Sequence, residues 1–136
     1  MSNAIFISIK PIHVNRIIEG LKEFEYRNYI PKKGFDTIFV YTTIPVAKLQ
    51  YILKIDYVVE YTEKITIESH NVEEFNNGKL TKYAYHISEI HELDTPIDLK
   101  KLKRDFLFSP PQAYAYDEKY NNLTKYIKKA NKKRLR

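Results

Sequence analysis

Two cations and two carboxylates lie within the eight residues GLKEFEYR (20–27). The segment favours a short strand, in which Glu25 and Arg27 point to the same face and Lys22 stands at the entrance. If that face turns inward, Glu25 and Arg27 must pair with each other or meet a ligand, because an unpaired buried ion costs several kcal/mol. If it turns outward, the charges form a solvated surface worth under about 1 kcal/mol. The pattern alone leaves both alternatives open.

Two kinds of chemistry fit such a cluster. In a binding site, Lys22 and Arg27 would contact a phosphate or a base carbonyl, and Glu25 would orient Arg27 or accept from a base amino group. In a hydrolase, Glu25 would act as general base and Lys22 would stabilise an oxyanion or phosphate. The second alternative requires a raised pKa for Glu25.

The segment PPQAYAY (110–116) is a second candidate. Gln112, Tyr114 and Tyr116 share one face of an expected strand. Glutamine can read a base edge through paired hydrogen bonds, and tyrosine rings can stack on bases. The alternative is a structural strand, with tyrosines that cover the core and prolines that mark a tight turn.

The net charge of +6 lies entirely in the last twenty residues. Residues 117–136 hold eight Lys and Arg against two acids, whereas the other 116 residues hold fifteen of each sign. Such asymmetry indicates non-specific attraction to a polyanion, and the alternative is a solubilising tail. The basic side chains assigned to this role are Lys125, Lys128, Lys129, Lys132, Lys133 and Arg134.

Several classes of site and location are excluded or disfavoured. Cysteine is absent, which excludes thiolate zinc sites and fits a cytoplasmic location. Three glycines are too few for a P-loop or a dinucleotide fingerprint. The four histidines, which show no metal-ligand spacing and are therefore predicted to be incidental, are His13, His70, His86 and His91. We expect no metal, no cofactor, no signal peptide and no membrane segment, since no apolar run approaches about 20 residues.

The elements that must position these residues follow from periodicity and from breaker residues. The predicted strands cover residues 4–9, 24–27, 37–42, 46–61, 83–93 and the end of 106–116. The predicted helical segments follow Pro11, cover 72–77, lie near Leu99 after a Thr95–Pro96 turn, and begin at a cap on Asp117. This order predicts an α+β domain built as a small mixed barrel of five to six strands, with short flanking helices and a C-terminal helix. We place the domain in residues 1–116 and a basic helix or tail in 117–136, with fraying over residues 128–136.

The order of several short motifs resembles the ASCH domain family of the PUA-like superfamily. The motifs are SIKP (8–11), GxKxxExR (20–27), IPKK (30–33), YTTxPV (41–46), KYAYHI (82–87) and PPQ with its aromatic residues (110–116). The resemblance covers residues 5–116 and is similar to archaeal and phage-type members, while the basic C-terminal segment lies outside it.

The resemblance implies a PUA-like β-barrel with a cleft beside the first helix. The residues that it and the motifs above assign to ligand binding are Ser8, Lys10, Lys22, Glu25, Arg27, Tyr41, Thr42, Gln112 and Tyr114. The implied partner is RNA, single-stranded by expectation, or a small molecule that contains a nucleobase. The alternative is a hydrolase that acts on RNA or a modified nucleoside, with Lys22 and Glu25 as catalytic residues. In the amidohydrolase type a threonine stands where this chain has Glu25, so that hydroxyl nucleophile is missing.

Overall fold

The computed structural model describes residues 3–136, which form a single mixed sheet with short helices around it. The sheet order is β2-β5-β4-β3-β1-β6, and β7 pairs with β5. The strands are β1 (Ala4–Ile9), β2 (Phe24–Arg27), β3 (Thr37–Thr42), β4 (Lys48–Glu60), β5 (Tyr83–Asp98), β6 (Ala115–Tyr116) and β7 (Lys132–Arg134). The helices are α1 (Pro11–Ile18), α2 (Val72–Asn76), α3 (Leu99–Phe106), the 3₁₀ turn η1 (Asp117–Tyr120) and α4 (Asn121–Lys129). None of these helices reaches the length and apolarity that crossing a bilayer requires.

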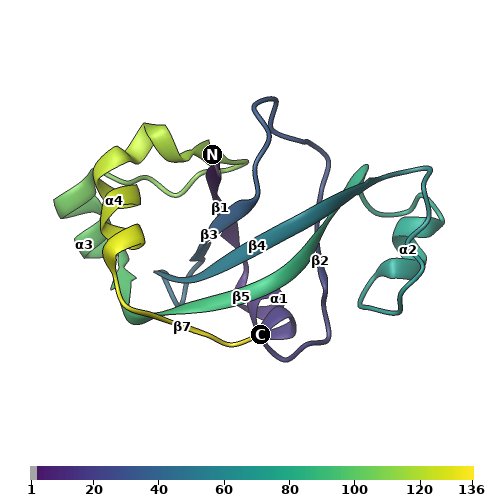
Figure 1. Cartoon of the computed structure of the whole chain (residues 1–136), viewed down its shortest axis with the longest axis horizontal. Coiled ribbons are helices and arrows are strands. Elements are labelled where there is room, and N and C mark those ends of the chain that lie inside the picture. The colour runs from purple at the N-terminus through teal and green to yellow at the C-terminus, as the bar shows by residue number, and fades with distance from the viewer. Residues whose placement is uncertain (1–2) are drawn as a thin grey trace.

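The sheet curls into a half-barrel, which confirms the predicted α+β architecture. Strands β1 and β3 are parallel, and every other pair is antiparallel. The long strands β4 and β5 cross the whole molecule, with α2 at one end and α3 and α4 at the other (Figure 1). Their register shifts at several points, and such irregularities bend and twist a strand pair.

Both faces of the sheet carry a core because β1 alternates apolar residues on each side. Ile5 and Ile7 pack with Val14 and Ile17 of α1 on one face. On the other face, Phe6 packs in a cluster with residues from α3 and α4, which include Leu102, Leu123 and Ile127.

The predicted turn at Thr95–Pro96 is wrong, because β5 continues through it to Asp98. Pro96 lies where the pairing of β5 with β4 is interrupted. The backbone N–H that proline lacks is therefore not needed for a hydrogen bond to β4. Asp98 then caps α3 by accepting a hydrogen bond from the backbone N–H of Lys101 (2.9 Å).

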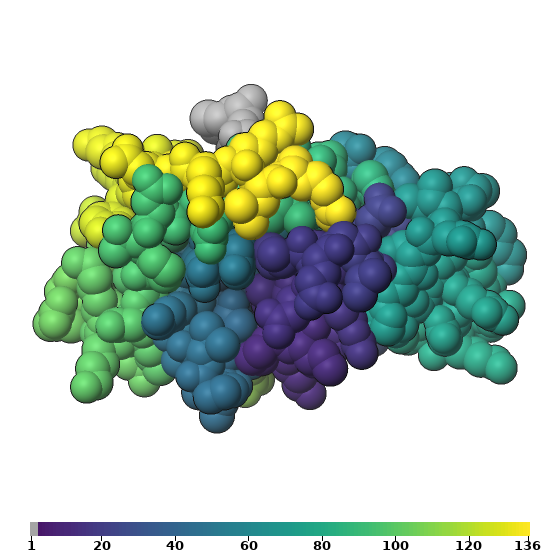
Figure 2. All heavy atoms as spheres, turned by 90° about the horizontal axis from the view of Figure 1, so that it is seen from below, coloured from purple at the N-terminus to yellow at the C-terminus, as the bar shows by residue number. Residues whose placement is uncertain are grey.

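The C-terminal segment also differs from the expectation. Asp117 does not cap a long helix; its carboxylate accepts from the backbone N–H of Ala4 (3.2 Å), and α4 begins only after η1. The fraying predicted over residues 128–136 is wrong as well, since β7 pairs with β5 and Arg134 lies opposite His91. Figure 2 shows this segment lying along the body and reaching the region of α1. The division of the chain at residue 116 stays a prediction.

Candidate functional site

A cavity of about 300 Å³ opens beside α1, near the end of β1 and next to β2. Its size lies at the lower end of the range for small-molecule sites. The lining residues are Ser8, Ile9, Lys10, His13, Lys22, Glu25, Tyr26, Arg27, His70, Asn71, Leu80 and Thr81. The cavity therefore joins the first motif to the loop that precedes α2.

Three charged side chains form a buried ion-pair cluster in this lining. The Glu25 carboxylate accepts from Lys22 Nζ through Oε1 (2.8 Å) and from Arg27 Nη2 through Oε2 (2.8 Å). Lys22 and Glu25 are each only 3% exposed. The charged face thus turns inward, and each buried ion has its opposite charge, as the desolvation cost requires.

The local fold holds this cluster in place. Gly20 adopts a left-handed conformation (φ 82°) after α1, and the backbone N–H of Lys22 bonds to Arg16 O (3.1 Å). Antiparallel pairing of β2 with β5 then fixes the direction of Glu25 and Arg27.

A chain of contacts ties β2 to the opposite side of the cavity. Arg27 Nη2 donates to Ser8 O (3.2 Å), and Ser8 Oγ donates to Pro111 O (2.8 Å). The PPQ segment is therefore joined to the cluster through Ser8 and Arg27.

The electrostatics of the cluster keep Glu25 ionised. Burial by itself raises the pKa of Glu25, but the charges and hydrogen bonds of Lys22 and Arg27 outweigh it and hold that pKa below its ordinary value of 4.5. A general base that works near neutral pH needs a raised pKa instead. Glu25 therefore does not meet the raised-pKa condition of the hydrolase alternative, and the catalytic roles of Lys22 and Glu25 stay predictions.

The lowered pKa of Glu25 predicts a stability change in acid. The stabilisation is complete above the unfolded pKa of about 4.5 and is lost as the pH falls from there through the folded pKa. Urea unfolding of the wild type and Glu25→Gln should show a constant stability gap from pH about 7 to about 5.5 and a narrowing gap below about 4.5. A gap that stays constant down to pH about 3 would contradict the pairing.

Two histidines that the sequence marked as incidental line the cavity. Burial and the nearby Lys22 lower the pKa of His13, and burial and Arg16 lower the pKa of His70. Both rings are therefore neutral at pH 7. Arg16 Nη1 lies 3.0 Å from His70 Nε2, and because arginine only donates, the proton of His70 is on Nδ1. Residues 13 and 70 are too far apart in sequence for spacing to have revealed them.

Two polar atoms of the lining are left without partners. Within residues 3–136, His13 Nδ1 and Arg27 Nε are buried and make no hydrogen bond. Buried polar groups in proteins are nearly always paired, so such atoms point to a ligand or an ordered water.

The comparisons with known proteins identify the fold. The chain superposes on the crystal structure of ASCH from Zymomonas mobilis with a TM-score of 0.67 and 21% identity, over 94% of this chain and 96% of that one. The chain has the ASCH fold. A tyrosine-to-phenylalanine mutant of that protein gives a TM-score of 0.67 at 21% identity, over 94% of this chain and 99% of that one. A serine-to-alanine mutant gives a TM-score of 0.64 at 22% identity, over 94% of this chain and 96% of that one. No family model and no curated protein matches the sequence, and the archaeal or phage-type origin stays a prediction.

The ASCH fold brings together five of the nine predicted binding residues. The five that line the cavity are Ser8, Lys10, Lys22, Glu25 and Arg27.

The other four predicted binding residues lie outside the lining. Tyr41 is buried against Phe108 (6.0 Å between centroids), and Thr42 is buried with no hydrogen-bond partner for Oγ1 among the described residues. Gln112 is exposed, and Tyr114 stacks on Tyr29 (5.2 Å). Their roles stay predictions.

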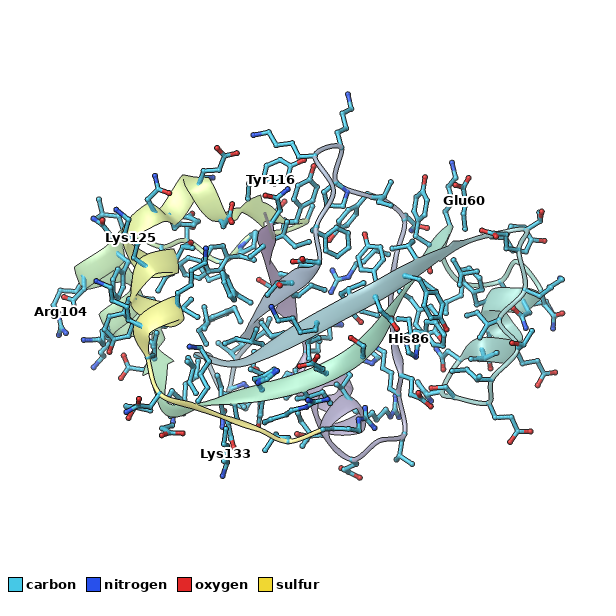
Figure 3. The ribbon with its side chains drawn as sticks, in the orientation of Figure 1. Glu60, His86, Arg104, Tyr116, Lys125 and Lys133 are labelled. Carbon is cyan, nitrogen blue, oxygen red and sulfur yellow. The ribbon has the colours of Figure 1, made fainter. Side chains whose placement is uncertain are left out.

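The predicted basic residues do not line the cavity either. Lys125 and Lys133 are exposed on α4 and β7. Lys125 and Arg104 both lie at the end of the molecule opposite α2 (Figure 3). The remaining ones, Lys128, Lys129, Lys132 and Arg134, lie on the same two elements. All six basic residues therefore lie on α4 and β7, outside the cavity lining. Among residues 3–136, no three His, Asp or Glu side chains gather as metal ligands would.

Proposed function

We propose that this protein binds single-stranded RNA, or a small molecule that contains a nucleobase, in the cavity beside α1. The observation that carries the proposal is the buried Lys22–Glu25–Arg27 cluster in the lining. Its two cations and one carboxylate leave one net positive charge, which suits a phosphate or a polarised carbonyl. The ASCH fold, which is PUA-like and associated with RNA binding, supports a partner of the nucleic-acid type.

Exposure divides the roles within the cluster. The side chain of Arg27 is 20% exposed, whereas those of Lys22 and Glu25 are 4% exposed. Arg27 is thus the member that reaches a ligand, with its planar guanidinium suited to a phosphate or a base carbonyl. Lys22 and Glu25 hold that guanidinium in place.

The neighbouring groups suit a nucleobase. The neutral ring of His13, whose Nδ1 is unpartnered among residues 3–136, can donate or accept at a base edge. Beyond Ser8 and Pro111, the stacked rings of Tyr29 and Tyr114 offer an aromatic surface for a second base.

The basic residues of α4 and β7 would add long-range attraction without sequence preference. Contacts of this kind release counterions, so we expect RNA affinity to fall steadily as salt rises.

The test is the effect of Arg27→Ala on binding of a short single-stranded RNA, measured by fluorescence anisotropy at fixed salt. We expect affinity to fall at least about tenfold, since a hydrogen bond to a charged group contributes about 1.5–3 kcal/mol. Arg104→Ala is the matched control, because Arg104 is 69% exposed in its side chain and lies on α3. The control should change affinity less than about twofold.

Equal losses of RNA affinity in Arg27→Ala and Arg104→Ala would show that binding is general electrostatics. Unchanged RNA affinity in both variants would show that Arg27 is not part of the binding site. Circular dichroism of both variants establishes that the fold is intact. A panel of nucleotides and modified nucleosides, titrated in the same way, distinguishes RNA from a small-molecule ligand.

A further inference from the structure

A second cavity, of about 240 Å³, lies on the face of the sheet opposite α1. Thr37 and Phe39 point to it, whereas the alternating residues Ile38 and Val40 belong to the core under α1. The residues that line it are Ala4, Thr37, Phe39, Ile52, Lys54, His91, Ile127, Lys128 and Lys132. It shares no residue with the cavity beside α1.

The strand register explains why this space exists. Phe39 pairs with Ile52, and Ile52 pairs with His91, which gives a largely apolar row across β3, β4 and β5. Ile127 of α4 packs in the same core cluster as Phe39 and Ile52. The neighbouring row pairs Thr37 with both Ala4 and Lys54, and its small or polar side chains leave the gap unfilled.

The floor of the cavity is apolar and its rim is cationic. Phe39, Ile52 and Ile127 are buried. Lys54, Lys128 and Lys132 contribute three positive charges, and the lining holds no acid.

Two of the three ammonium groups at the rim donate to neutral oxygens. Lys54 Nζ donates to Thr37 Oγ1 (3.0 Å), and Lys132 Nζ donates to Lys128 O (3.2 Å) and Ala130 O (2.8 Å). Within residues 3–136, none of the three lysines forms a salt bridge.

The nearby carboxylates are already engaged. Glu89 accepts from His91 (2.9 Å) and lies 3.9 Å from Arg134, and Asp36 accepts from Thr37 Oγ1 (2.8 Å). Burial lowers the pKa of Lys132, so an anion beside it would recover the lost solvation. The rim therefore has the charge complement of an anionic ligand.

We propose that this cavity binds a small monocarboxylate with an apolar body, either aromatic or branched aliphatic. The body lies on Phe39 and Ile52 above the buried Ile127, and the carboxylate faces the lysine rim. The volume exceeds the roughly 150 Å³ of an apolar cavity that takes up benzene and is below the usual range for drug-sized ligands. A ligand of about ten non-hydrogen atoms fits these limits.

The test compares phenylacetate with phenylacetamide, which has nearly the same shape and no charge. We expect phenylacetate to cause saturable NMR shifts at Phe39, Ile52 and Ile127, and phenylacetamide to bind at least about tenfold more weakly. The Lys54→Met/Lys132→Met variant should lose at least about tenfold in phenylacetate affinity. Lys48→Met, an exposed lysine on the same strand β4, should bind as the wild type does.

Equal binding of the acid and the amide would overturn the proposal, and so would shifts that do not saturate or that avoid the lining. Unchanged affinity in the double variant would also overturn it. Should Lys132→Met loosen β7, Lys54→Met alone supplies the same comparison, since Lys54 lies on a central strand.

Discussion

Glu25→Leu is expected to lower the free energy of unfolding by about 3–5 kcal/mol. The substitution removes the partner of Lys22 Nζ, which is 2.8 Å away, and leaves a cation that is only 3% exposed without its counter-charge. A loss of this size is a large part of the roughly 5–15 kcal/mol that stabilises a domain. Urea unfolding followed by circular dichroism measures it.

The control for this prediction is Lys22→Met/Glu25→Leu, which removes both buried charges. We expect it to recover most of the lost stability, because replacing a buried pair by apolar groups of similar volume is often neutral. Arg27 has the more exposed side chain of the two cations and can meet solvent. A loss below about 1 kcal/mol in Glu25→Leu would match an exposed ion pair and contradict the burial.

Ile127→Ala is expected to cost about 2–5 kcal/mol. Ile127 is fully buried and packs with Phe6 and Leu123 in the core on the face of the sheet opposite α1. The effect would show that the basic C-terminal segment is needed for the stability of the fold. Urea unfolding measures the change.

Leu107→Ala is the matched control for Ile127→Ala, because Leu107 is 84% exposed after α3. Its cost should stay within about 0.5 kcal/mol. Equal costs in the two variants, or a cost below about 0.5 kcal/mol in Ile127→Ala, would mean that α4 does not contribute to the core.

The sequence predicted much of the fold because its strands carry strong local patterns. The alternation in 4–9 and the β-branched run in 37–42 matched β1 and β3. The features it missed depend on pairing between distant segments. β7 is held by main-chain hydrogen bonds to β5, which no periodicity in KKR reveals, and β5 passes through Pro96 because the pairing with β4 is interrupted there.

The candidate site could be predicted only in part for a similar reason. Spacing placed Glu25 and Arg27 on one face, but the curl of the whole sheet decides whether that face is inside or outside. His13 and His70 reach the same cavity through α1 and the loop before α2, and they share no motif.

Binding of a nucleobase-containing partner in the cavity beside α1 is tested most directly by NMR. Titration of a short single-stranded RNA, and in parallel of a nucleotide panel, should shift the amides of 8–10, 12–13, 22–27 and 70–71 in a saturable way. Those shifts should disappear in Arg27→Ala while the spectrum otherwise stays folded. Shifts confined to α4 and β7, or no saturable shift with any of these partners, would contradict the account.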